Sequence, residues 1–142
     1  MNEAEIALTR EAVACKHWAW MPGMLDINGR RIIRVDGDKL TVAWYGNPHH
    51  RLAPDITVVS ATDFPPDLDD PATVGGLEAL VQRVLGHDGV NVIVEPRWGV
   101  GVGYRVTRWT RSAIDSYQPM TIGGMGHATK AAALVAALKA AP

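Results

Sequence analysis

The residues best suited to bind a metal ion or to act as a nucleophile are few and widely spaced in this chain. Cys15 is the only cysteine, His17 follows two positions later, and His49 and His50 are adjacent in a proline-flanked segment. Thiolate and imidazole are ligands that zinc prefers, so these four residues are the candidates for a metal site. Cys15 with His17 is also the candidate for a catalytic thiol. Their spacing is not that of a zinc finger, and a lone cysteine is more often a small buried side chain.

A glycine run offers a second kind of chemistry. Glycines alternate at positions 99, 101 and 103, where backbone N–H groups could surround a phosphate. The run lacks a Gly-Lys-Ser/Thr ending and opens no helix, which favours a bent strand. The serines are Ser60, Ser112 and Ser116, and none stands in a Gly-x-Ser-x-Gly elbow.

An acidic cluster precedes the central helix. Asp67, Asp69 and Asp70 could coordinate a hard cation, but acidic residues are also favoured at a helix start by the helix dipole. The second interpretation is preferred, since Asp70 stands at the cap position and Pro71 at the first helical position. The sequence thus predicts no catalytic residues, no bound metal and no cofactor.

Aromatic residues and arginines mark a candidate contact surface, because five tryptophans accompany a single phenylalanine. Strand alternation places Arg105, Thr107, Trp109 and Arg111 on one face, which could stack nucleobases or form a protein-binding hot spot. Alternatively, the tryptophans fill the core and the arginines lie across them. The candidate partner-binding residues on this strand are Trp98, Arg105, Arg108, Trp109 and Arg111.

Residues 112–126 have little periodicity and much glycine, which predicts a long loop. Tyr117, Met120 and Met125 are the candidate contact residues in this segment, because tyrosine and methionine are enriched at interfaces. The alternative is an extra strand on the sheet.

The first half of the chain predicts one helix and then strands. Asn2 can cap the helix, with Glu5 three residues later. Helical spacing then puts Ile6, Thr9 and Val13 on one face. Strands are predicted over residues 31–35, 39–45 and 56–60, with turns at residues 28–29 and 36–37. Residues 61–70 are predicted to be a linker.

The second half predicts a helix, two strands and a closing helix. The helix begins at Pro71 and ends at Gly86. Its predicted apolar stripe comprises Val74, Leu77, Val81 and Val84, with Leu80 beside it. Strands follow over residues 90–94 and 98–109. An alanine-rich helix over residues 128–140 is expected to bury Leu134, Val135 and Leu138.

Composition fits an ordinary globular protein. The chain has 142 residues, 47% hydrophobic and 20% charged, with a formal net charge of −1. These values predict one compact α+β domain over residues 1–142, with sub-lobes over 1–64 and 67–142 as an alternative. Antiparallel hairpins or a meander should carry two or three helices packed on the sheet. The absence of a basic excess weakens the case for nucleic-acid binding. With no secretion signal and no membrane-spanning run, the expected location is the cytoplasm.

Three segments resemble small uncharacterised proteins of bacteriophages and prophages: residues 18–24 (WAWMPGM), 67–75 (DLDDPATVG) and 128–138 (ATKAAALVAAL). From Asp70 onward the chain resembles the phage ABA sandwich domain. The resemblance implies a helix–sheet–helix arrangement for the C-terminal half and carries over no catalytic residues. The chain departs from that pattern at residues 112–126.

Taken with the resemblance, these features predict a non-enzymatic phage or prophage accessory protein in the cytoplasm of a bacterial host. It would bind a host macromolecule, with a host protein preferred and inhibition of a defence or regulatory factor as one role. The alternatives are a nucleic-acid-binding module that uses the Arg/Trp strand, and a small metal protein or enzyme built on Cys15, His17, His49 and His50.

Overall fold

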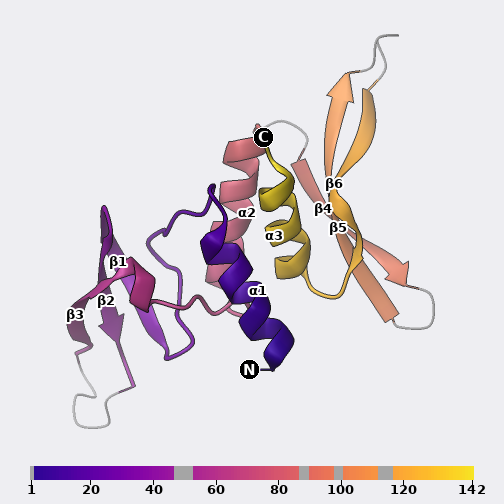
Figure 1. The fold of residues 1–142 in the computed structure, drawn as a ribbon. Helices are drawn as coiled ribbons and strands as arrows, with labels where there is room; N and C mark the ends of the chain where they lie inside the picture. Colours follow the sequence, from indigo (N-terminus) through magenta and orange to yellow (C-terminus); the bar gives the residue numbers. More distant parts are fainter. Residues whose placement is uncertain (1, 47–52, 87–89, 98–100, 112–116) are drawn as a thin grey trace. The chain divides into compact units, whose positions relative to one another are not determined.

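The computed structural model describes residues 2–46, 53–86, 90–97, 101–111 and 117–142. The chain forms two compact units (Figure 1). The first contains Met1–Val13 and Ala19–Gly76, and the second contains Ala14–Trp18 and Leu77–Pro142. The predicted α+β class, with antiparallel strands and helices packed on sheets, is confirmed.

The first unit opens with helix α1, Glu3–Ala14. Its capping box forms as predicted: Asn2 Oδ1 accepts from the Glu5 backbone N–H at 2.9 Å, and a Glu5 carboxylate oxygen accepts from the Asn2 backbone N–H. Of the residues predicted to share one face, Thr9 is buried together with Ala12, whereas Ile6 and Val13 are exposed.

The first sheet is a three-stranded antiparallel meander in the order β1-β2-β3. Its strands are β1 (Arg30–Asp36), β2 (Lys39–Trp44) and β3 (Asp55–Ser60), close to the predicted positions. Gly37 forms the β1–β2 turn with a φ of 62°. Glycine adopts this positive φ at little energetic cost because it has no Cβ. Leu40 and Val42 are fully buried on one face of β2.

The predicted linker over residues 61–70 is instead packed into the first unit. A short 3₁₀ helix, Ala61–Asp63, is followed by three buried residues, Phe64, Pro66 and Leu68. The Phe64 ring meets the Trp20 ring edge to face, with centroids 5.0 Å apart. Proline and aspartate disfavour regular secondary structure in this segment, but burial of these apolar side chains stabilises its packed conformation.

Helix α2, Pro71–Leu85, belongs to both units. It starts and ends as predicted, with the Asp70 carboxylate accepting from the Thr73 backbone N–H at 2.8 Å and with Gly86 at φ of 96°. The buried stripe differs from the predicted one, because Val74 and Val84 are only half-buried. The buried residues are Thr73, Leu77, Leu80, Val81 and Leu85.

The second unit contains a three-stranded antiparallel sheet in the order β4-β5-β6. Its strands are β4 (Val90–Arg97), β5 (Gly101–Arg111) and β6 (Tyr117–His127). Strand β6 occupies most of the segment predicted to be a loop, so the alternative of an extra strand is the right one there. Residues 112–116 lie outside the described residues.

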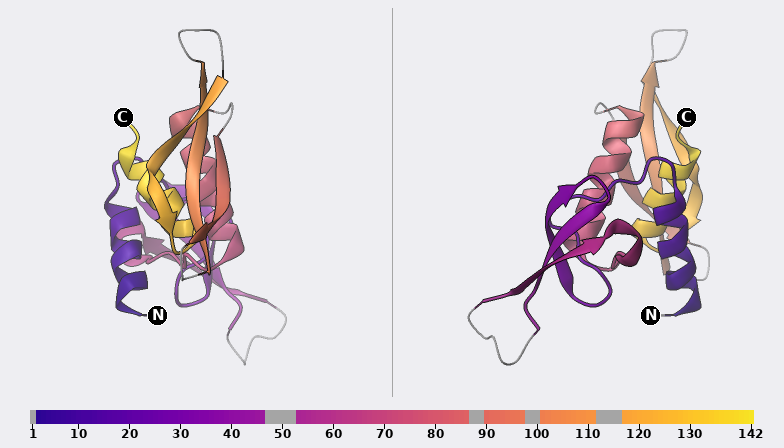
Figure 2. Two further views of the ribbon diagram at one scale, coloured as in Figure 1. Left: turned by 90° about the vertical axis from the view of Figure 1, so that its right-hand side faces the viewer. Right: turned by 60° about the vertical axis from the view of Figure 1, so that its left-hand side comes forward.

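Helix α3, Lys130–Ala140, packs against this sheet, mainly on β6 and β5. The Thr129 hydroxyl caps it by accepting from the Ala132 backbone N–H at 3.1 Å. Leu134, Val135 and Leu138 are buried as predicted. Figures 1 and 2 show α3 and the Leu77–Leu85 half of α2 on the same side of the sheet. Within the described ranges, no helix has the length and apolar character needed to cross a membrane.

Candidate binding surface on the second sheet

Strand pairing assigns the candidate residues of β5 and β6 to faces of the sheet. Residues that stand opposite each other in an antiparallel pair share a face. Val106 and Val90, both buried, lie on the face that the helices cover. Arg105, Thr107 and Trp109 therefore lie on the opposite face, which we call the outer face.

The outer face carries an ion pair that bridges two strands. Arg105 Nε on β5 lies 3.0 Å from a carboxylate oxygen of Glu95 on β4. On its other side, Arg105 Nη1 donates to the Thr121 hydroxyl of β6 at 3.2 Å. The guanidinium thus joins all three strands, and its charge is compensated within the face.

Thr107 and Trp109 continue this face along β5. Thr107 stands opposite Asn91 on β4 and Thr121 on β6, and is buried. Trp109 stands opposite Pro119 and is 46% exposed. A large aromatic side chain of this exposure, on a face that also carries a compensated ion pair, is typical of a protein-binding hot spot with a polar border.

Two other candidates lie on the opposite face of the same hairpin. Arg108 stands opposite both Val90 and Met120, so Arg108 and Met120 belong to the helix-covered side. Met120 is nevertheless exposed. The structure therefore does not bring these two residues together with Trp109.

Met125 occupies a third position, in an irregular part of β6 that we call the glycine bulge, residues 123–126. Tyr104 pairs with His127 while Val106 pairs with Ile122, so four residues of β6 lie opposite one residue of β5. Gly123, Gly124 and Gly126 all have positive φ. The Gly123 carbonyl accepts from His127 Nε2 at 2.9 Å. Met125 is 67% exposed.

The remaining contact candidates cannot be placed as side chains. Trp98 lies outside the described residues, and Arg111 and Tyr117 are described only by their backbone pairing with each other. The predicted surface is thus represented by Arg105 and Trp109 on the outer face.

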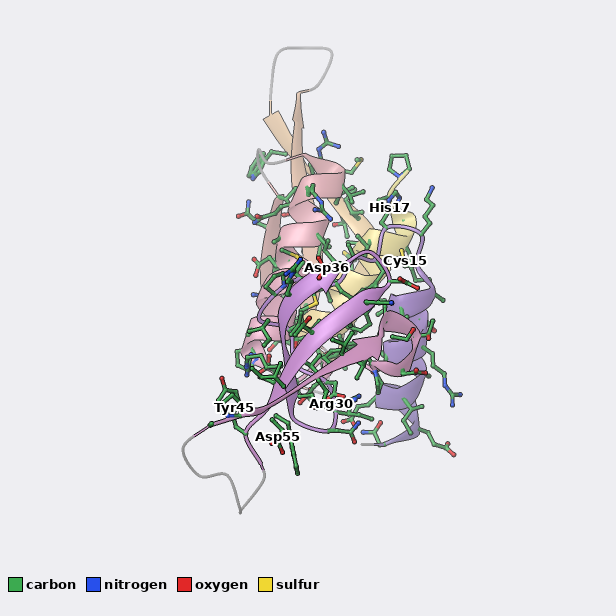
Figure 3. The ribbon with its side chains drawn as sticks, turned by 90° about the vertical axis from the view of Figure 1, so that its left-hand side faces the viewer. Cys15, His17, Arg30, Asp36, Tyr45 and Asp55 are labelled. Carbon is green, nitrogen blue, oxygen red and sulfur yellow. The ribbon has the colours of Figure 1, made fainter. Side chains whose placement is uncertain are left out.

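The metal and nucleophile candidates are only partly described. Cys15 and His17 follow the end of α1 and are half-buried (Figure 3), whereas His49 and His50 lie outside the described residues. Among the residues with described placement, no group of three or more His, Cys, Asp and Glu side chains could hold a metal ion.

The glycine run and the acidic cluster have structural roles where they are described. Gly101 and Gly103 belong to β5 and pair with Arg97 and Glu95, in agreement with the strand interpretation. Asp70 caps α2, as described above. The Asp67 carboxylate accepts from the Asp69 backbone N–H at 3.0 Å, a local turn contact.

Sequence reasoning missed the most heavily bonded carboxylate of the first unit. Asp26 is fully buried and accepts from the backbone N–H groups of Asn28 and Arg30 at 3.0 and 2.7 Å. An aspartate two residues before Asn-Gly is a signal for such a turn. Comparison of the chain with known protein families, with curated proteins and with solved structures found no match.

Proposed function

We propose that the chain is a non-enzymatic binding protein whose second unit docks a protein partner through the outer face of the β4-β5-β6 sheet. The observation that carries this proposal is the exposed Trp109 on the same face of the sheet as the Arg105–Glu95 ion pair. An aromatic side chain of this kind gains most when a partner removes it from water. The resemblance to phage and prophage proteins supports a partner from a bacterial host and a role in inhibiting a host factor.

The Arg105–Glu95 ion pair favours a protein over a nucleic acid. Glu95 compensates Arg105, so this ion pair adds no net positive charge to the outer face. Nucleic-acid binding depends on cations that neutralise phosphates and release counterions. A compensated arginine and an exposed aromatic ring on one face are better suited to a protein surface that has polar and apolar parts.

The test compares two substitutions on opposite faces of one hairpin. Tagged wild type, Trp109→Ala and Met120→Ala are each incubated with a bacterial host lysate treated with nuclease, and the bound proteins are identified by mass spectrometry. We expect the wild type and Met120→Ala to retain the same partner and Trp109→Ala to lose at least about 90% of it, since hot-spot truncation costs about 2 kcal/mol or more. Both side chains are about half exposed, which makes the pair a matched control.

Three outcomes contradict the proposal. Equal recovery by all three proteins would show that the outer face is not the contact surface. Recovery of no specific protein by the wild type would argue against a protein partner. Binding of duplex or single-stranded DNA or RNA that falls steeply with added salt and requires Trp109 would identify a nucleic-acid partner instead.

A further inference from the structure

Strand β3 forms an open edge of the first sheet. Within the residues that the structure describes, only one side of β3 pairs with a neighbour in the order β1-β2-β3, along six consecutive residue pairs without a register shift. An edge of this kind presents unpaired backbone N–H and C=O groups that can accept another strand.

The middle of β3 is exposed on both faces. Ile56 is 61% and Val58 is 64% exposed, and Thr57 between them is also exposed. Ile56 stands opposite Ala43 and Val58 opposite Thr41, so both side chains lie on the face away from Leu40 and Val42. Tyr45, 68% exposed, follows β2 at the Asp55 end of the sheet, away from Asp36 (Figure 3).

Most of the devices that protect an edge strand are absent from β3, whose single charged residue, Asp55, is its first. Its six residues, DITVVS, include no lysine, no proline and no bulge. Natural proteins place charges, prolines or bulges on edges that must remain unpaired. Four consecutive β-branched residues on an edge with so little protection favour strand pairing instead.

We infer that β3 pairs antiparallel with β3 of a second copy of this chain, about a two-fold axis at Thr57, which joins two first sheets into a six-stranded sheet. This proposal stands on other residues than the proposed function and does not depend on it.

The sequence of β3 is self-complementary in that register. A two-fold axis perpendicular to the sheet keeps each residue on its own face, so paired positions must differ by an even number. With Thr57 on the axis, Ile56 faces Val58 of the partner copy and Thr57 faces its own equivalent. These Ile–Val and Thr–Thr pairs are favourable cross-strand neighbours.

Neighbouring registers fit less well. An axis at Val58 would place Ile56 opposite a serine hydroxyl, at Ser60 of the second copy. An axis at Ile56 would put the two Asp55 carboxylates only two residues apart, about 7 Å along the strand, whereas the axis at Thr57 separates them by about 13 Å. The second separation exceeds the Debye length of ~8 Å at physiological salt, so repulsion is largely screened.

Sedimentation of the full chain over a range of concentrations tests the association. We expect the wild type to dimerise reversibly and Val58→Lys to raise the dimer dissociation constant at least about ten-fold, since a charge would face an apolar side chain across the pair. The control is Ile33→Lys, an isoleucine that is 49% exposed on β1 at the other edge of the same sheet, which should dimerise like the wild type. A wild type that stays monomeric, or an equal loss in both variants, overturns the proposal.

Cysteine cross-linking tests the register. In a Cys15→Ser background, Thr57→Cys should form an intermolecular disulfide on mild oxidation, because a residue on the two-fold axis meets its own equivalent within disulfide reach. Val58→Cys should cross-link several-fold more slowly, since its equivalent lies diagonally across the pair. Equal or faster cross-linking of Val58→Cys overturns the Thr57 register.

Discussion

The carboxylate of Asp26 holds both the backbone and the side chain of Arg30. One carboxylate oxygen accepts from the Arg30 backbone N–H at 2.7 Å, and the other accepts from Arg30 Nε at 2.6 Å. Asp26 is fully buried, and Arg30 extends to donate to the Asp63 carbonyl at 3.1 Å and lies over the Phe64 ring. This pair therefore ties the start of β1 to the packed segment over residues 61–70.

Asp26→Asn should destabilise the first unit. The amide keeps the size of the side chain but loses the charge that faces the Arg30 guanidinium, and its NH₂ group cannot accept a hydrogen bond. Breaking one side of a buried ion pair leaves the other uncompensated, so we expect a loss of about 3 kcal/mol in the free energy of unfolding, measured by urea titration.

Asp36→Asn is the matched control for that substitution. Asp36 pairs with Arg34 at 2.8 Å, but both side chains are largely exposed, and surface pairs of this kind contribute little. The urea midpoint of the control should remain close to that of the wild type. Equal midpoints for the Asp26 and Asp36 variants would contradict a stabilising role of the buried pair.

Local signals predicted the ends of elements well. The Asn2–Glu5 capping box, the Asp36-Gly37 turn and the Gly86 helix end all form as the sequence indicates. Each depends on backbone conformations and hydrogen bonds within a few residues, which the sequence specifies directly. Such signals do not reveal what a segment packs against.

The predictions for the two segments expected to be irregular are wrong for that reason. Proline and aspartate in residues 61–70 argue against helix and strand, but not against burial of Phe64 and Leu68. The glycines of residues 123–126 lower strand propensity, yet β6 forms because it pairs with β5 and packs against α3. Tertiary contacts decide both cases.

The candidate surface could be predicted only within one strand. Alternation correctly placed Arg105, Thr107 and Trp109 on a common face, as the pairing with β4 and β6 shows. The Arg105–Glu95 ion pair depends on the register between strands, which residue types alone do not specify. Spacing in one strand likewise gave no indication that Met120 lies on the other face.

Gly75→Ala should stabilise the protein. Gly75 lies in α2, where a Cβ would meet no atom within 4 Å, so alanine gains helix propensity without a clash. We expect a gain of about 0.5–1 kcal/mol in the free energy of unfolding. Gly76→Ala is the comparison, because its Cβ would stand 2.7 Å from Met24 Cε. Part of the gain in helix propensity would then be lost in moving that buried side chain. A larger gain for Gly76→Ala in thermal unfolding would contradict this packing.

Asp70→Ala should weaken the start of α2, whereas Asp70→Asn should largely preserve it. Asp70 Oδ2 accepts from both the backbone N–H and the hydroxyl of Thr73, at 2.8 and 3.0 Å. Asparagine retains an acceptor oxygen at the cap, and alanine does not, so we expect a loss of about 1 kcal/mol for alanine alone. Urea unfolding with and without added Mg²⁺ distinguishes a cap from a cation site. A magnesium-dependent rise in the wild-type midpoint that both variants lack would favour the cation site.

Gly123→Ala should strongly destabilise the second unit. The new Cβ would stand 2.4 Å from the backbone carbonyl carbon of Ala136 and 2.5 Å from the Ala137 nitrogen, and helix α3 cannot yield there as a flexible side chain could. The positive φ of 75° adds strain. Together these effects should cost roughly 3 kcal/mol or more of unfolding free energy.

Gly101→Ala separates the two causes of that loss. Gly101 has a φ of 86° but no atom within 4 Å of its Cβ position, so alanine there should cost only the conformational strain, about 1–2 kcal/mol. Hydrogen exchange of the α3 amides provides the local readout, since Gly123→Ala should speed exchange at Ala136 and Ala137 and Gly101→Ala should not. If both variants lose the same stability with unchanged exchange in α3, the close approach of the glycine bulge to that helix does not stabilise the unit.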